Sequence, residues 1–140
     1  MVNVDGAGAS ETWVTCWTDQ VDDALTGSYG NTLIPGGRWL LDLLVPLFES
    51  RGARLTGIGF EYSGYWWMNV DMDSNSFLIL VYFDRGLGNV RVKRRKRIAR
   101  LFQWGGTSLS EQQLADVIIG VLNTDRRVRR AKVSSGFVEQ

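Results

Sequence analysis

The middle of the chain alternates between apolar and polar residues in a pattern that predicts an antiparallel meander. Residues 55–62, 65–72 and 90–95 change character at nearly every position, as half-buried strands do. Residues 77–83 are apolar throughout, which is typical of an interior strand covered on both faces. We therefore predict four consecutive strands, separated by turn-forming residues at 73–75 and 85–89.

The alternation also predicts which side chains share a face of the sheet. One face of the first strand would carry Thr56, Ile58, Phe60 and Tyr62, and one face of the second would carry Trp66, Met68, Val70 and Met72. The other face of the second strand would present Tyr65, Trp67, Asn69 and Asp71. Large aromatic side chains among polar ones are typical of a contact surface. The alternative is that a second layer covers this face, such as the N-terminal segment with Trp13 and Trp17.

Two segments repeat apolar residues at the spacing of an amphipathic helix. In residues 38–50 apolar positions recur every three or four residues, and Pro46 is expected to kink this helix or to divide it near Leu44. Gly52 would cap its C-terminal end. The second helix follows a capping box at residues 110–113 and ends at 123–125.

Shorter elements are predicted nearer the two ends of the chain. Residues 12–18 and 128–133 have the alternation of strands, residues 19–37 hold at most a brief helix at 21–25, and the first eleven residues are expected to be loose. The sum is a single α+β domain spanning residues 1–140. It would consist of a mainly antiparallel sheet of four to six strands with two main helices packed on one face.

Composition favours a soluble, cytoplasmic protein. The 140 residues, 44% of them hydrophobic, are enough for one core without covalent cross-links. Cys16 is the single cysteine, and the N-terminal residues lack the basic start and apolar run of a signal peptide. Apolar runs are too short to cross a bilayer, so no membrane association is expected.

The sequence contains no histidine, which removes most acid–base, triad and transition-metal chemistry. Asp71, Asp73 and Asp84 remain as an acid pair or a hard-cation site, but aspartate beside a turn is ordinary turn chemistry. The glycine pairs at 57–59 and 86–88 lack the helix start and the lysine of a phosphate-binding loop. We therefore expect no enzyme activity, no metal ion and no small-molecule cofactor.

Charge is segregated along the chain, although the net charge is only +1. The first fifty residues hold seven acids and one arginine, whereas residues 91–140 hold twelve Lys or Arg and four acids. The start of this basic part predicts a row of cations that would bind nucleic-acid phosphates: Arg91, Lys93, Arg95, Arg97 and Arg100. The alternative is a solvated edge strand, on which Lys and Arg prevent edge-to-edge pairing.

In size and in the helix–sheet–helix layout of residues 38–134, the chain resembles the small immunity proteins with which bacteria neutralise polymorphic or contact-delivered toxins. The resemblance implies a non-catalytic inhibitor that occludes a cognate toxin, with charge complementarity speeding association. Such toxins are often cationic nucleases, so it also implies contact through acidic residues: Asp19, Asp22, Asp23, Asp42 and Glu49. The alternative function is a nucleic-acid-binding or phage-type accessory protein that uses residues 91–100.

Overall fold

A computed structural model describes residues 11–20, 22–72, 75–95 and 110–138. In chain order the elements are β1 (Glu11–Thr18), β2 (Leu25–Thr26), β3 (Thr32–Ile34), α2 (Arg38–Ser50), β4 (Arg54–Glu61), β5 (Tyr65–Met72), β6 (Asn75–Asp84), β7 (Leu87–Arg95), α3 (Glu111–Thr124) and β8 (Val128–Ser134). The α+β fold predicted from the sequence is confirmed, and so are its two main helices. The predicted loose segment lies almost wholly outside the described residues.

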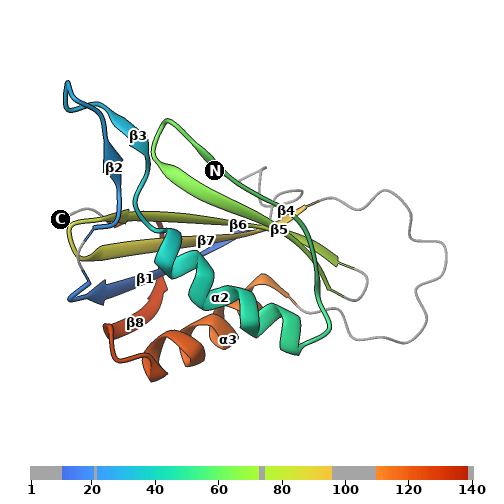
Figure 1. The fold of residues 1–140 in the computed structure, drawn as a ribbon. Helices are drawn as coiled ribbons and strands as arrows, with labels where there is room; N and C mark the ends of the chain where they lie inside the picture. Colours follow the sequence, from blue (N-terminus) through green and yellow to red (C-terminus); the bar gives the residue numbers. More distant parts are fainter. Residues whose placement is uncertain (1–10, 21, 73–74, 96–109, 139–140) are drawn as a thin grey trace, which may run out of the picture.

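The main sheet is antiparallel and has the strand order β4-β5-β6-β7-β1-β8 (Figure 1). The predicted meander forms the run from β4 to β7. Strand β1 lies between β7 and β8, so the first described strand is an interior strand, and among the described residues the edge strands are β4 and β8. The interpretation of the basic run as an edge strand is therefore wrong for residues 87–93 of β7, because β1 pairs with them on the side opposite β6.

Both helices pack on one face of this sheet and contact each other (Figure 1). Helix α2 contacts β4, β5 and β6, whereas α3 contacts β1, β7 and β8. The core between the two layers contains fully buried side chains from both: Leu40, Leu44, Phe48, Leu114 and Ile118 from the helices, and Val14, Met68, Ile79, Val90 and Val92 from the strands. Burial of one such side chain stabilises the fold by about 2 kcal/mol, so this layer fixes which sheet face stays outside.

Helix α2 runs without a break from Arg38 to Ser50, so the predicted division near Leu44 does not occur. Pro46 lies on the exposed side of the helix, and the burial of the opposite side offsets the backbone hydrogen bond that proline cannot donate. Gly52 follows the helix with a φ of 76°, and the N–H groups of Gly52 and Ala53 donate to the carbonyls of Glu49 and Phe48. This is the predicted glycine cap, in the form of a Schellman motif.

The capping box of α3 is confirmed in both of its hydrogen bonds. The Ser110 hydroxyl accepts from the Gln113 N–H at 3.1 Å, and the Gln113 side-chain oxygen accepts from the Ser110 N–H at 2.8 Å. The predicted end of the helix at residues 123–125 is also confirmed, because α3 stops at Thr124. The strands predicted at 12–18 and 128–133 are present as β1 and β8.

Three local features differ from the predictions. Strand β7 begins at Leu87, because Arg85 and Gly86 both have positive φ and make a two-residue turn in place of the longer one expected at 85–89. A register shift after Leu55 leaves Thr56 exposed and out of the face that it was predicted to share with Ile58. Described residues 22–37 contain the β2–β3 hairpin and no helix. The predicted turn at 73–75 lies mostly outside the described residues.

Candidate binding surface

The sheet face opposite the helices carries a row of side chains that crosses the sheet. Strand pairing places Trp67 beside Leu80, Leu80 beside Arg91, and Arg91 beside Trp13. Gly59 of β4 and Ser134 of β8 end the row at the two edges. Residues paired in neighbouring strands point to the same face, so one surface combines indole, aliphatic and guanidinium groups.

Five half-buried aromatic side chains lie on this surface, and we call them the aromatic face: Trp13, Trp17, Tyr65, Trp67 and Tyr82. The rings of Tyr65 and Tyr82 have centroids 5.1 Å apart, and those of Trp13 and Tyr82 are 5.8 Å apart. Trp13 and Trp17 therefore belong to the same layer as Tyr65 and Trp67. The alternative that the N-terminal tryptophans cover the face as a second layer is wrong, because β1 joins the sheet instead of crossing it.

The indole of Trp67 lies directly on the backbone of the edge strand β4. A Cβ atom at Gly59 would stand 2.6 Å from Cζ2 of Trp67, and one at Gly57 would stand 3.2 Å from Cζ3. These two glycines, predicted as strand glycines, thus leave the space that the indole occupies. Beside the ring is a groove of about 320 Å³, which we call the Trp67 groove, lined by Tyr65, Trp67, Asn69, Leu78, Leu80 and Arg95.

The two tryptophans of β1 form cation–π contacts with basic side chains. The guanidinium carbon of Arg91 lies 5.6 Å from the ring centroid of Trp13, and that of Arg130 lies 4.5 Å from the ring of Trp17. The ammonium nitrogen of Lys132 lies 5.4 Å from the same ring of Trp17. Contacts of this kind contribute about 0.5–1 kcal/mol each at exposed sites, and they hold the cations against the aromatic rings.

The predicted row of cations on β7 is present as far as the structure describes it. Arg91, Lys93 and Arg95 occupy alternate positions of β7. Strand pairing places them beside Leu80, Leu78 and Ser76 of β6, respectively. Arg97 and Arg100 lie outside the described residues. Asp71, predicted on the same face, forms an ion pair with Arg54 at 3.6 Å. The described part of the face therefore has more positive than negative groups.

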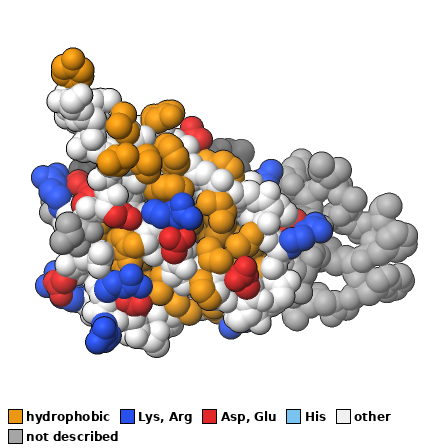
Figure 2. Space-filling view, viewed as in Figure 1, with side chains coloured by type: hydrophobic (Ala, Val, Ile, Leu, Met, Phe, Trp, Pro, Cys, Tyr) orange, Lys and Arg blue, Asp and Glu red, His pale blue; other side chains and the backbone are white. Residues whose placement is uncertain are grey.

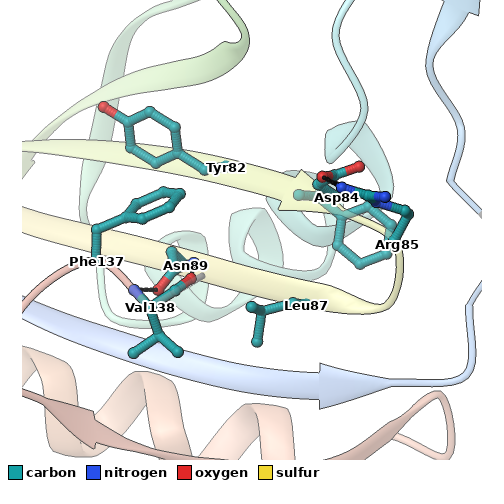
Figure 3. A pocket seen from close by; sticks show the side chains of 8 residues that line it. Tyr82, Asp84, Arg85, Leu87, Asn89, Phe137 and Val138 are labelled. Carbon is teal, nitrogen blue, oxygen red and sulfur yellow. Dashed lines mark hydrogen bonds and ion pairs between the residues drawn. The ribbon is translucent and has the colours of Figure 1, made fainter. Parts of the chain in front are cut away.

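The C-terminal segment lies against one end of the aromatic face (Figure 3). The Asn89 amide donates to the carbonyl of Val138 at 2.9 Å and accepts from its N–H at 3.0 Å. Phe137 packs edge-on against both Trp13 and Tyr82. A pocket of about 410 Å³ lies between this segment and the β6–β7 turn, where the carboxylate of Asp84 pairs with Arg85 at 3.3 Å.

The acidic residues expected to contact a toxin have several different surroundings. Asp23 accepts hydrogen bonds from the backbone of Gly37 and Trp39, and Asp22 accepts one from the backbone of Ala24. Asp19 forms an ion pair with Arg129 at 3.3 Å. Two others lie exposed on α2, where Asp42 pairs with Arg38 at 2.9 Å and Glu49 is near the C-terminal end. Asp22 and Asp23 therefore have a structural role at the base of the β2–β3 hairpin.

That hairpin projects from the body of the protein (Figure 1) and was not identified from the sequence. Tyr29, in its turn, is 96% exposed, and Leu25 and Leu33 on its strands are also exposed. Figure 2 shows hydrophobic side chains at the tip of the hairpin and gathered below it on the helix side of the molecule. Strands of two and three residues are too short for alternation to reveal. The available signal was three large apolar residues among glycine, serine, threonine and asparagine.

The carboxylates considered for catalysis are not brought together. Asp71 pairs with Ser76 at one end of β6 and Asp84 lies at the other end, roughly 26 Å away at the rise of a β-strand. Asp73 lies outside the described residues. Burial raises the pKa of the Cys16 thiol to about 12. Over the described ranges, no three His, Cys, Asp or Glu side chains are grouped as a metal site would require.

Within the described part of the chain, neither helix has the length and apolar character needed to span a membrane. Comparison with known proteins gives no match to a protein-family model, to a curated protein or to a solved structure.

Proposed function

We propose that this protein is a non-catalytic inhibitor that binds a partner protein through its aromatic face. The observation that carries this proposal is the half-buried state of five aromatic side chains on a sheet face to which neither described helix packs. Tryptophan, tyrosine and arginine are the residues most enriched at the energetic centres of protein interfaces. Held on a rigid sheet, they lose little conformational entropy when a partner covers them.

Within this proposal, the protein acts as an immunity protein that occludes a bacterial toxin. The projecting β2–β3 hairpin supports such a role, because it offers a second contact element with an exposed tyrosine at its turn. The hairpin is also fixed at its base by Asp23, so it needs little ordering on binding. A projection of fixed position is suited to entering the mouth of an enzyme cleft.

A second candidate function is binding of single-stranded nucleic acid on the same face. It is favoured by Arg91 and Lys93, because both cations lie where β7 is paired on both sides and edge protection does not account for them. Single-stranded nucleic acids bind to such faces by stacking bases on aromatic rings. Protein binding is the better supported function, because bases would have to stack on the rings of Trp13 and Trp17. Arg91, Arg130 and Lys132 already lie over these rings.

The test is co-purification of the tagged full-length chain from its native host, followed by calorimetry with the isolated partner. We expect a stoichiometric protein partner whose Kd rises by roughly 10- to 100-fold with Trp67→Ala or Tyr65→Ala. Tyr62→Ala is the matched control, because Tyr62 is an exposed tyrosine outside the aromatic face. Failure to recover a partner, or equal effects of Tyr62→Ala and Tyr65→Ala, would contradict the proposal.

The nucleic-acid candidate is tested by titrating the protein with oligothymidylate at several salt concentrations. Phosphate binding must strengthen as salt falls, and substitution of Lys93 should reduce the slope of log K against log salt by about 0.7. Absence of binding at low salt removes this candidate and leaves the protein-binding proposal standing.

A further inference from the structure

We propose that the Trp67 groove is an anchor site for an aromatic side chain of the partner that lies next to a carboxylate. This inference rests on the proposed function and specifies the chemistry of the partner at one point of contact. It is carried by the largely apolar lining of the groove and by the cation in that lining.

The groove has the size and the walls for a planar ring. It is a shallow groove of about 320 Å³ that is open to solvent, so a phenyl ring with a substituent can lie against its lining. Trp67 and Tyr65 supply aromatic walls, and Leu78 and Leu80 supply aliphatic ones. A ring placed here would displace water mainly from Tyr65, Trp67 and Leu78, which are partly exposed, and this is the main source of affinity in such sites.

The orientation of Trp67 is fixed by the edge strand on which it lies. Any side chain at Gly59 would overlap the indole, so the glycine lets the ring lie close to the β4 backbone. On the other side, Trp67 is paired with Leu80, which is almost fully buried. The indole is therefore held in place before a ligand arrives, so little conformational entropy of Trp67 is lost when a ring binds beside it.

The polar lining favours an anion beside that ring. Arg95 lines the groove, and Lys93 lies next to it on the same face and beside Leu78. Asp71 is the nearby described acid on β5, and its ion pair with Arg54 reduces its effect on Arg95. Asn69 adds an amide that can donate a hydrogen bond to a carboxylate. The favoured ligand is thus an aromatic group with a carboxylate close to it in space.

This chemistry differs from the partner that the acidic N-terminal residues suggested. Those residues predict a cationic partner surface, whereas the groove accepts an acidic one, and two of the acids are occupied at the hairpin base. The anchor would therefore be a phenylalanine, tyrosine or tryptophan next to an aspartate or glutamate on the partner. An inhibitor that binds an acidic and aromatic patch in the Trp67 groove disfavours partners that would place a lysine or arginine in this groove.

The experiment uses the full chain labelled with ¹⁵N and follows the indole N–H signals during titration with phenylacetate. We expect the Trp67 signal, identified by its loss in Trp67→Phe, to shift with a Kd on the order of 1 mM, as a ligand of this size allows. Phenylacetamide, which has the same shape without the charge, should bind several-fold more weakly. Arg95→Gln should remove this difference, whereas Arg51→Gln, at an exposed arginine after α2, should preserve it.

Three results would overturn the inference. The first is a Trp67 signal that does not move, and the second is equal binding of phenylacetate and phenylacetamide. The third is tighter binding of thymidine 5′-monophosphate than of phenylacetate, which would assign the groove to a nucleotide. Failure of the proposed function gives a different result. If phenylacetate binds but Trp67→Ala leaves the partner's affinity unchanged, the groove is a ligand site but the aromatic face is not the interface with the partner.

Discussion

The carboxylate of Asp23 accepts a hydrogen bond of 2.7 Å from the backbone N–H of Gly37, the residue that precedes helix α2. Its second oxygen accepts from the N–H of Trp39 at 3.1 Å. Gly37 has no side chain to cap the helix, so an aspartate from outside the helix satisfies two N–H groups at its start. The negative charge is also at the favourable end of the helix dipole.

Removal of this external cap should destabilise the protein. Asp23→Ala is expected to lower the free energy of unfolding by about 1–2 kcal/mol, because two N–H groups at the helix start lose their acceptor. Asp42→Ala, which removes an exposed carboxylate from the same helix, should change it by less than about 0.5 kcal/mol. Urea denaturation of both variants measures the difference, and equal values would contradict a capping role.

Two glycine-to-alanine changes should have opposite signs. Gly59→Ala places a methyl group 2.6 Å from Trp67 and should lower the free energy of unfolding by about 1–3 kcal/mol. Gly120→Ala, in the exposed side of α3 with no atom near the new methyl group, should raise it by about 0.5–1 kcal/mol. Thermal unfolding compares the two. A neutral Gly59→Ala would mean that the indole moves freely, which the proposed anchor site does not allow.

The thiol of Cys16 should not react in the folded protein. It is fully buried, and burial raises its pKa to about 12, so the thiolate that alkylates is nearly absent at neutral pH. Mass spectrometry after iodoacetamide treatment should show no adduct in native buffer and one adduct in about 6 M urea, where the chain is unfolded. A rapid native reaction would show that β1 opens locally, because Cys16 lies in the interior of the sheet.

Asp125 should contribute stability at neutral pH that is lost in acid. Hydrogen bonds of 2.9 and 3.0 Å from the Arg127 guanidinium, together with one from the Arg127 backbone, hold the pKa of Asp125 below its ordinary value of 3.8. A lowered pKa in the folded state gives stabilisation above the unfolded value, and this is lost as the pH falls through the folded value. Asp125→Asn should therefore lower the free energy of unfolding at pH 7, and the difference from the parent protein should shrink as the pH falls through the folded pKa of Asp125.

Local patterns were sufficient for the features that depend on neighbouring residues. The alternation of 65–72 correctly separated Trp66 and Met68, which are buried, from Tyr65 and Trp67, which lie on the aromatic face. The capping box at Ser110 correctly located the start of α3. In both cases the information lies within one turn or one strand, where side-chain direction follows directly from spacing.

Features that depend on residues far apart in the chain could not be predicted from local sequence patterns. Nothing near Arg91 indicates that β1 pairs with β7, and this pairing changes the basic run from an edge to an interior strand. Nothing near Asp23 indicates that its carboxylate caps a helix that begins at Arg38. The acidic residue was expected to contact a partner because an unpaired charge is usually a surface charge. Its actual partners are backbone groups, which no sequence pattern displays.

The position of β1 between β7 and β8 has a consequence for the order of folding. Thr15 contacts Asn89 and Ser134, which are 74 and 119 residues away in the chain, so β1 completes its pairing only after both β7 and β8 have been synthesised. The meander from β4 to β7 is built from neighbours in sequence and can form earlier. Trp13 and Trp17 therefore join Trp67 and Tyr82 only when β7 is present to pair with β1, and a partner that contacts all four side chains binds only the assembled sheet.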